Sequence, residues 1–235
     1  MTAPVVAAGA IAKAMLATAG IQIAAYTQQL GRLVDEEERY LRDVRRTSKE
    51  NPVRAADPGL ALEMVNEIMA AKEEGDSLGG VVRCLAVGLP MGVGEPYFDS
   101  LESELAKMLF SIPGVKGVEF GSGFRGAGMR GSENNDQFII EDGEVRTITN
   151  NAGGILGGIS NGMPVDIRVA FKPTASISRE QKSVDLERME DTTIKIEGRH
   201  DPCIVPRGVI VVEAATALVL ADMCLRGDFI AREHR

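Results

Sequence analysis

The apolar and polar positions of this chain follow two spacings. Apolar residues that return every three or four positions predict helices, and this pattern marks residues 4–17, 58–74 and 101–109. A proline in the first turn supports the first two helices, and Asp99 is the expected cap of the third. The last apolar segment, 208–225, begins as a β-branched run and continues as a buried helix.

Short apolar runs bounded by glycine or turn residues predict strands. They cover 20–26, 80–88, 115–120, 165–171 and 192–197, with a hairpin at 138–149. Strands and helices do not alternate strictly, which disfavours a doubly wound parallel sheet. We therefore predict an α+β fold, in which antiparallel sheets carry helices on one face, formed by residues 1–235 as a single domain. The charged segment 35–46 has no wide apolar face and is interpreted as a solvated helical turn or a mobile segment.

Composition narrows the classes of function. The chain is 44% hydrophobic and 26% charged, as soluble globular proteins are. Its formal net charge of −8 argues against nucleic-acid binding, which needs a basic face. The three cysteines form no CxxC pair, so neither a disulfide framework nor a metal site is expected. The chain shows no signal peptide and no apolar run of membrane-spanning length, and we expect a cytoplasmic protein.

Three segments of the second half suggest a site for a phosphorylated ligand. The glycine pairs of Asn150–Gly162 let a backbone approach a ligand closely. The Lys-Pro-Thr-x-Ser turn at 172–176 follows a predicted strand and offers a cation, two hydroxyls and free amides. The Arg-His-Asp-Pro-Cys sequence at 199–203 places a fixed cation, an imidazole and a carboxylate side by side.

Each segment also has a plain structural explanation. Lys-Pro and Thr-x-Ser are common in simple turns, and the glycine-rich stretch, which lacks GxGxxG spacing, is also expected where two backbones pack closely. His200 alone could merely anchor a turn. Asp201 precedes a proline, which fixes its direction, and the neighbouring Arg199 favours its charged form, so that it is available as a base or acceptor. Cys203 is expected to be a small buried packing residue.

Taken together and in this order, the three segments resemble chorismate synthase, a family of flavin-dependent lyases. Further matches are Glu74-Gly75-Asp76-Ser77-x-Gly79-Gly80, Pro90-x-Gly92-x-Gly94-Glu95-Pro96-x-Phe98-Asp99 and Val115–Gly121. The resemblance implies a β-α-β sandwich and the 1,4-elimination of phosphate from 5-enolpyruvylshikimate-3-phosphate with reduced flavin mononucleotide (FMN). That reaction gives chorismate, in the shikimate pathway of aromatic amino-acid biosynthesis. The resemblance also implies a homotetramer and an association with NADP, and it leaves open how the flavin is reduced.

The resemblance also implies which residues form the site. The expected FMN contacts are Pro113, Gly114, Gly157, Lys172, Pro173, Thr174, Ala175, Ser176 and Arg199. Asp201 and His200 are the expected catalytic residues, with Asp201 near the flavin N5 position. We expect one pocket to gather Gly157, Lys172, Thr174, Ser176, Arg199 and Asp201. The glycine-rich stretch 121–133 is expected to be a mobile lid over that pocket.

The resemblance begins inside the family sequence. Val6–Lys13 resembles an interior segment of the family, and the family region before it, with two histidines and several substrate-binding arginines, has no counterpart here. We therefore expect an N-terminally incomplete member, with part of the first half of the sandwich missing, little or no activity, weak FMN binding, and self-association through uncovered apolar faces. Two hypotheses stay open: a chorismate synthase, or a catalytically incompetent fragment that binds flavin or only assembles with a partner.

Overall fold

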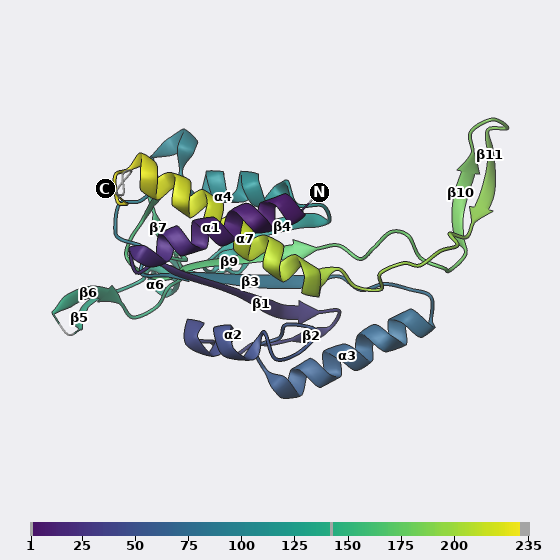
Figure 1. The fold of residues 1–235 in the computed structure, drawn as a ribbon, viewed down its shortest axis with the longest axis horizontal. Helices are drawn as coiled ribbons and strands as arrows, with labels where there is room; N and C mark the ends of the chain where they lie inside the picture. The colour runs from purple at the N-terminus through teal and green to yellow at the C-terminus, as the bar shows by residue number, and fades with distance from the viewer. Residues whose placement is uncertain (1, 142, 231–235) are drawn as a thin grey trace.

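The computed structural model describes residues 2–141 and 143–230. A five-stranded antiparallel sheet forms the centre of this part of the chain. The strands lie in the order β2 (Leu33–Val34), β1 (Gln22–Leu30), β3 (Gly80–Val87), β9 (Val165–Phe171) and β4 (Val115–Phe120). Three of these strands have the predicted bounds to within one residue, and the antiparallel α+β class is confirmed. Figure 1 shows the sheet as the middle layer of the molecule.

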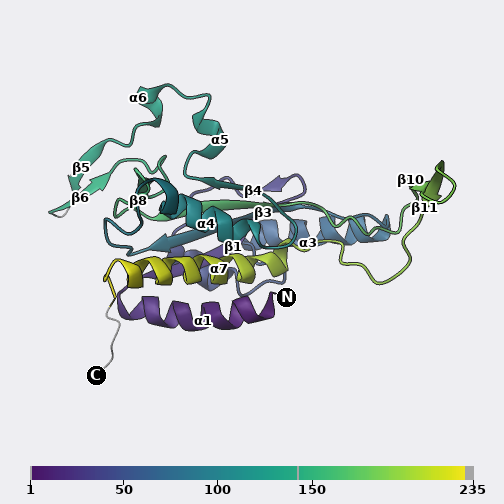
Figure 2. The same ribbon diagram turned by 90° about the horizontal axis from the view of Figure 1, so that it is seen from above.

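Helices cover both faces of this sheet (Figure 1, Figure 2), so our prediction of helices on one face was wrong. On one face α7 (Val205–Arg226) packs on β1 and β3, while α4 (Leu101–Phe110) lies beside it over β4. The helix α1 (Ala3–Thr18) packs along α7, and Figure 2 shows it as the outer layer. On the other face α2 (Leu41–Thr47) packs on β1, and α3 (Pro58–Glu73) lies beside β2 at the sheet edge.

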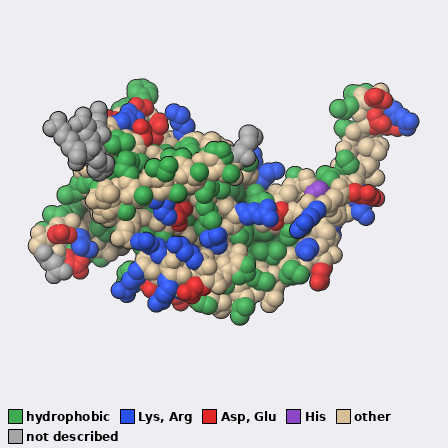
Figure 3. All heavy atoms as spheres, in the orientation of Figure 1, with side chains coloured by type: hydrophobic (Ala, Val, Ile, Leu, Met, Phe, Trp, Pro, Cys, Tyr) green, Lys and Arg blue, Asp and Glu red, His purple; other side chains and the backbone are tan. Residues whose placement is uncertain are grey.

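The alternation of side chains along β1 explains why both faces are covered. Ile23 and Ala25 belong to the large core that includes α7, while Ala24 and Tyr26 pack with Leu41 of α2 in a second, smaller core. Successive strand residues point to opposite faces, so an apolar run of this length needs a partner on each side. The charged segment around α2 is solvated on its outside, where Figure 3 shows a group of Lys and Arg side chains, but it also supplies buried apolar residues.

The segment predicted to begin as a strand is helical from its first turn. The helix α7 starts at Val205, and its β-branched residues Val209, Val211 and Val212 are buried. Burial between the sheet and α1 outweighs the small helix cost of β-branched residues. By length and composition α7 could cross a membrane, so our expectation that no apolar run is long enough was wrong. However, 72% of the most apolar 18-residue stretch of this helix is buried inside the fold, as expected of a core helix.

Smaller elements extend from the sheet. Outside the five-stranded sheet, three pairs of short strands form hairpins among the described residues. They are β5 (Phe138–Glu141) with β6 (Glu144–Thr147), β7 (Ile155–Leu156) with β8 (Ile159–Ser160), and β10 (Gln181–Asp185) with β11 (Glu190–Ile194). The first confirms the predicted hairpin, and the last replaces a strand predicted at 192–197. Figure 1 shows β10 and β11 as an arm that projects from the body.

Short helical turns complete the chain. They are η1 (Tyr97–Asp99), α5 (Gly123–Gly126) and α6 (Gly131–Asn134). The last two lie in the stretch expected to be a lid, which therefore has helical turns of its own; whether it moves stays a prediction. The cap of α4 is Ser100, whose hydroxyl accepts a hydrogen bond from the Ser103 amide at 3.1 Å. Our assignment of Asp99 as the cap was wrong by one residue, because Asp99 belongs to the preceding turn.

Candidate functional site

Three segments that are distant in sequence meet beside the first residues of β3. They are the loop Gly75–Gly79 after α3, the turn Lys172–Ser178 after β9, and the segment Gly198–Cys203 before α7. The Ser77 hydroxyl donates to the Thr174 carbonyl at 2.7 Å, and the Ser178 amide donates to the Gly75 carbonyl at 2.9 Å. On its other side the loop is held through the Leu78 amide, which donates to the Pro202 carbonyl at 2.8 Å. The loop therefore joins two of the predicted site segments.

Two glycines allow this loop to lie so close to the sheet. A Cβ atom on Gly79 would lie 2.5 Å from the Phe171 carbonyl oxygen, and one on Gly80 would lie 2.1 Å from the Gln29 carbonyl oxygen. Both neighbours are backbone atoms of strands, which cannot rotate out of the way. Glycine is thus required at these positions for the loop to reach the turn at 172–178.

The predicted contacts Pro113 and Gly114 lie next to this turn. The Lys172 amide donates to the Gly114 carbonyl at 2.9 Å. Gly114 has a φ of +92°, and a Cβ there would lie 2.8 Å from Ile204 Cδ1. The structure therefore brings Gly114, Lys172 and the start of α7 together, although Pro113 and the Lys172 side chain are exposed.

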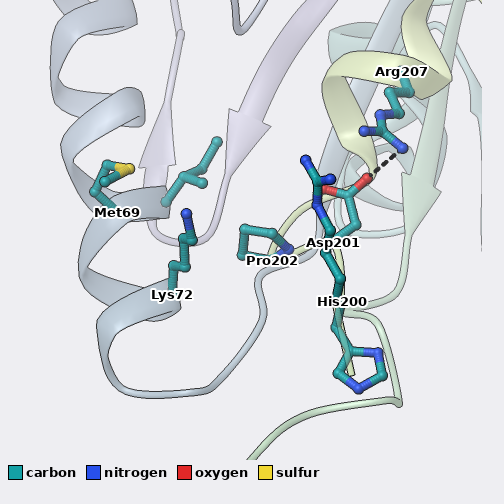
Figure 4. A pocket seen from close by; sticks show the side chains of 8 residues that line it. Met69, Lys72, His200, Asp201, Pro202 and Arg207 are labelled. Carbon is teal, nitrogen blue, oxygen red and sulfur yellow. Dashed lines mark ion pairs between the residues drawn. The ribbon is translucent and has the colours of Figure 1, made fainter. Parts of the chain in front are cut away.

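Two adjoining cavities, of about 470 and 300 Å³, open between α3 and the segment at 198–203. Both are lined by Lys72, Arg199, His200, Asp201 and Pro202. The larger cavity is completed by Ile68, Met69 and Arg207, and the smaller by residues that include Asp76, Ser176 and Ser178. Figure 4 shows Met69 and Lys72 on the helix, facing Pro202 and Asp201 across the larger cavity.

The charges around the larger cavity do not balance. Asp201 is paired with Arg207 at 2.9 Å, which is the dashed contact in Figure 4. Within residues 2–141 and 143–230, neither Lys72 nor Arg199 forms an ion pair or a side-chain hydrogen bond. A chain with a net charge of −8 thus exposes two uncompensated cations at one cavity, an arrangement that favours an anionic ligand.

Two polar side-chain atoms of the predicted site segments also lack partners among the described residues. Thr174 Oγ1 and His200 Nε2 are buried and make no hydrogen bond to any described residue. A buried polar atom without a partner costs free energy, and such atoms gather at sites that a ligand or water completes. The His200 ring is turned away from Arg207 and Asp201, as Figure 4 shows.

One cysteine, Cys203, directly follows the cavity-lining residues Asp201 and Pro202. Cys203 is buried, which confirms its predicted packing role, and burial raises the pKa of its thiol to about 11. The thiol therefore stays protonated and weakly nucleophilic at neutral pH. Among the described residues, no group of three or more His, Cys, Asp or Glu side chains could hold a metal ion.

Gly157 lies away from the other predicted contacts. It occupies the turn between β7 and β8, where Gly157 and Gly158 have φ values of +63° and +90°. This hairpin packs near the start of β9, because Gly154 adjoins Pro164, whereas Lys172 follows the end of the same strand. Seven strand residues span roughly 20 Å. A single pocket that contains both Gly157 and Lys172 stays a prediction. Within this chain, the two residues lie near opposite ends of β9.

Sequence reasoning missed one contributor to the site, Lys72 of α3. This residue lines both cavities, but in the sequence it looks like an ordinary helix surface residue. The segment Gly75–Gly80 resembles the family, but the sequence alone assigns it no role. Its paired glycines were the available signal for a close backbone approach.

Comparisons with known proteins show which family this chain is similar to. The profile of the family described as chorismate synthase matches residues 1–225. The chain is 53% identical over 232 residues to a protein named chorismate synthase from Dehalococcoides mccartyi, covering 99% of this chain and 64% of that protein. A chorismate synthase from Methanosarcina mazei is 52% identical, with 96% of this chain and 61% of the relative covered.

A solved structure extends the similarity to the fold. The structure titled "Crystal Structure of Chorismate Synthase" superposes with a TM-score of 0.81 and 30% sequence identity, covering 96% of this chain and 63% of that one. The chain therefore spans somewhat less than two thirds of the length of the proteins that it matches.

Proposed function

Because this chain belongs to the chorismate synthase family, we propose that its function is the lyase reaction of that family. The substrate would be 5-enolpyruvylshikimate-3-phosphate, and the products chorismate and phosphate. In this 1,4-elimination the C6–H bond and the C3–O bond to phosphate break, a second ring double bond forms, and a base takes the C6 proton. The chain would act in the cytoplasm, as part of aromatic amino-acid biosynthesis.

The observation that carries this proposal is that Arg199, which has no ion-pair partner among the described residues, lines a cavity together with Ser176. Both residues line the smaller cavity, so a guanidinium and a hydroxyl face the same space. An arginine can bind two phosphate oxygens at once, and such charge-assisted hydrogen bonds are about twice as strong as neutral ones. Phosphate groups occur both on the substrate and on FMN, and the cavity therefore suits either one.

Reduced FMN is the cofactor that we propose for this site. Thr174 Oγ1 and His200 Nε2, buried and without partners among the described residues, would bind polar groups of the cofactor, and Arg199 would bind its phosphate. When bound, the reduced flavin supplies an electron-rich ring that assists loss of the substrate phosphate. The Asp201 carboxylate, held by Arg207 at 2.9 Å, would accept a proton. Its orientation is set by that ion pair and by Pro202.

A second function, flavin binding or assembly without turnover, is favoured by a different observation. Gly157 and Lys172 lie at opposite ends of β9, so the full set of proposed FMN contacts is not gathered within this chain. We also propose a homo-oligomer, since α1 exposes Ile11 to 75% on the outer layer of the fold. Contacts between copies could bring the separated parts of the site together.

One assay separates the two functions. The purified chain is incubated anaerobically with reduced FMN and 5-enolpyruvylshikimate-3-phosphate, and chorismate is followed by its absorbance. The Methanosarcina mazei chorismate synthase serves as the positive control. Turnover that is lost in Arg199→Ala and Asp201→Asn supports the lyase function. FMN binding without turnover supports the second function, and the absence of both contradicts the proposed site.

A further inference from the structure

We propose that Lys72, in the last turn of α3, binds the phosphate of a phosphomonoester ligand at this site, opposite Arg199. The inference rests on the proposed function and adds to it a residue from an element outside the segments predicted to bind the ligand. It also gives the loop Gly75–Gly79 a role, which is to hold the end of α3 against the site.

The position of Lys72 follows from the way in which α3 ends. Gly75, with a φ of +70°, turns the chain out of the helix, and the following loop is tied to Thr174 and to Pro202 by hydrogen bonds of 2.7 and 2.8 Å. Those bonds fix the last turn of α3 beside both predicted segments. Lys72 consequently lines both cavities, and Figure 4 shows its amine on the side of the helix that faces Pro202 and Asp201.

The charge balance makes an anion the expected occupant. Of the ionic groups that line the two cavities, Asp201 pairs with Arg207 at 2.9 Å, and Asp76 pairs with Arg179 at 2.7 Å. Lys72 and Arg199 alone have no such partner in the part of the chain that the structure describes. A dianionic phosphate between the two cations would satisfy both, through charge-assisted hydrogen bonds.

The wall of the larger cavity supports an organic phosphate rather than a free ion. Ile68 and Met69 from α3 and Pro202 from the facing segment line it together with the cations. An apolar wall beside a cationic rim suits a ligand that has a ring or carbon skeleton and a terminal phosphate. FMN and 5-enolpyruvylshikimate-3-phosphate share this chemistry, and the experiment must tell them apart.

A simpler role for Lys72 makes a different prediction. A lysine in the last turn of a helix is stabilised by the helix dipole without any ligand. Replacing such a lysine would lower the stability of the protein slightly, and it would not change the affinity for phosphate-bearing ligands relative to their phosphate-free analogues.

The test measures dissociation constants of the chain for two matched pairs of ligands. FMN and riboflavin differ only in the phosphate and are followed by flavin fluorescence. Shikimate-3-phosphate and shikimate are measured by titration calorimetry. The variants are Lys72→Gln, Lys72→Arg and, as a control, Lys107→Gln on α4, which does not line either cavity. Thermal unfolding and circular dichroism confirm that each variant is folded.

We expect Lys72→Gln to weaken binding of at least one phosphorylated ligand by roughly tenfold or more, to leave its phosphate-free analogue unchanged, and to be partly rescued in Lys72→Arg. If Lys72→Gln weakens the binding of FMN, the phosphate that Lys72 binds is that of the cofactor. If it weakens the binding of shikimate-3-phosphate, the phosphate is that of the substrate. Equal affinities of the wild type and Lys72→Gln overturn the inference but not the proposed function. The inference is also overturned if Lys72→Gln weakens the binding of a phosphorylated ligand and of its phosphate-free analogue to the same extent. If the wild type binds none of the four ligands, the inference and the proposed site both fail.

Discussion

Arg83 on β3 and Asp166 on β9 form a buried, doubly hydrogen-bonded ion pair across the sheet. Arg83 Nε and Nη2 donate to Asp166 Oδ1 and Oδ2 at 2.9 and 2.8 Å, and each residue is 8% exposed. Burial lowers the pKa of Arg83, but the hydrogen bond and the charge of Asp166 raise it by more, so the guanidinium stays charged. Arg83 lies directly opposite Arg168 in the strand register, and Asp166 offsets this repulsion between like charges.

Removing Asp166 is expected to destabilise the sheet strongly. Asp166→Ala leaves a buried guanidinium without its main partner, and we expect the free energy of unfolding to fall by about 3 kcal/mol. The matched control is Glu38→Gln, because Glu38 contacts the same guanidinium at 3.0 Å but is itself 87% exposed. That variant should lose less than about 1 kcal/mol. Urea unfolding measures both, and equal losses would contradict a special role for the buried pair.

Because the Tyr26 side chain is buried, we expect the protein to lose stability at alkaline pH. Burial raises the pKa of Tyr26 to about 12, while the unfolded chain ionises near the ordinary value of about 10. Between these values the unfolded state releases the proton first, so stability is complete below about pH 10 and falls as the pH rises toward 12. Between pH 9 and pH 11.5, we expect the free energy of unfolding to fall by roughly 2 kcal/mol less in the Tyr26→Phe protein than in the wild type. Unfolding curves at the two pH values measure this difference, and parallel pH profiles would rule out the assigned cause.

Gly79 connects the stability of the sheet to ligand binding. In Gly79→Ala the new Cβ would lie 2.5 Å from the Phe171 carbonyl oxygen, so the loop must move. We expect a loss of about 2 kcal/mol of stability and weaker FMN binding, since the loop carries the Ser77 contact to Thr174. The control is Gly131→Ala, where a Cβ meets no atom within 4 Å. A Gly79→Ala protein that matches this control in both measurements would show that the loop position is not required.

The outer helix predicts self-association. Ile11 on α1 is 75% exposed, and most of the neighbouring alanines of α1 are exposed as well. An apolar surface of this kind favours burial against another molecule. We expect sedimentation at high protein concentration to show oligomers of the wild type and fewer of them for Ile11→Glu. Leu62→Glu, on α3 at a site that is 69% exposed, should not change the distribution. A monomeric wild-type chain would contradict this prediction.

Local sequence patterns were sufficient to predict the helices and strands in which the intrinsic preference of the residues agrees with the packing of the folded protein. The helices α1 and α3 and the strands β3, β9 and β4 follow directly from apolar spacing, proline position and glycine boundaries. The hairpin of β5 and β6 likewise needs only its turn residues. In each of these segments the residues alone favour the structure that packing later stabilises, so the prediction holds without knowledge of the rest of the fold.

Other features depended on long-range packing and were not visible in the sequence. The β-branched start of α7 is helical because α1 and the sheet bury it, and Leu41 on α2 is buried because Tyr26 and Ala24 present a second apolar face. The site shows the same division. The sequence by itself identified Lys172–Ser176 and Arg199–Asp201 as chemically suited to phosphate, since residue types are a local property. Only the tertiary structure decided that Lys72 joins them and that Gly157 lies at the other end of β9, because strand order and loop contacts arise from pairing between residues far apart in the chain.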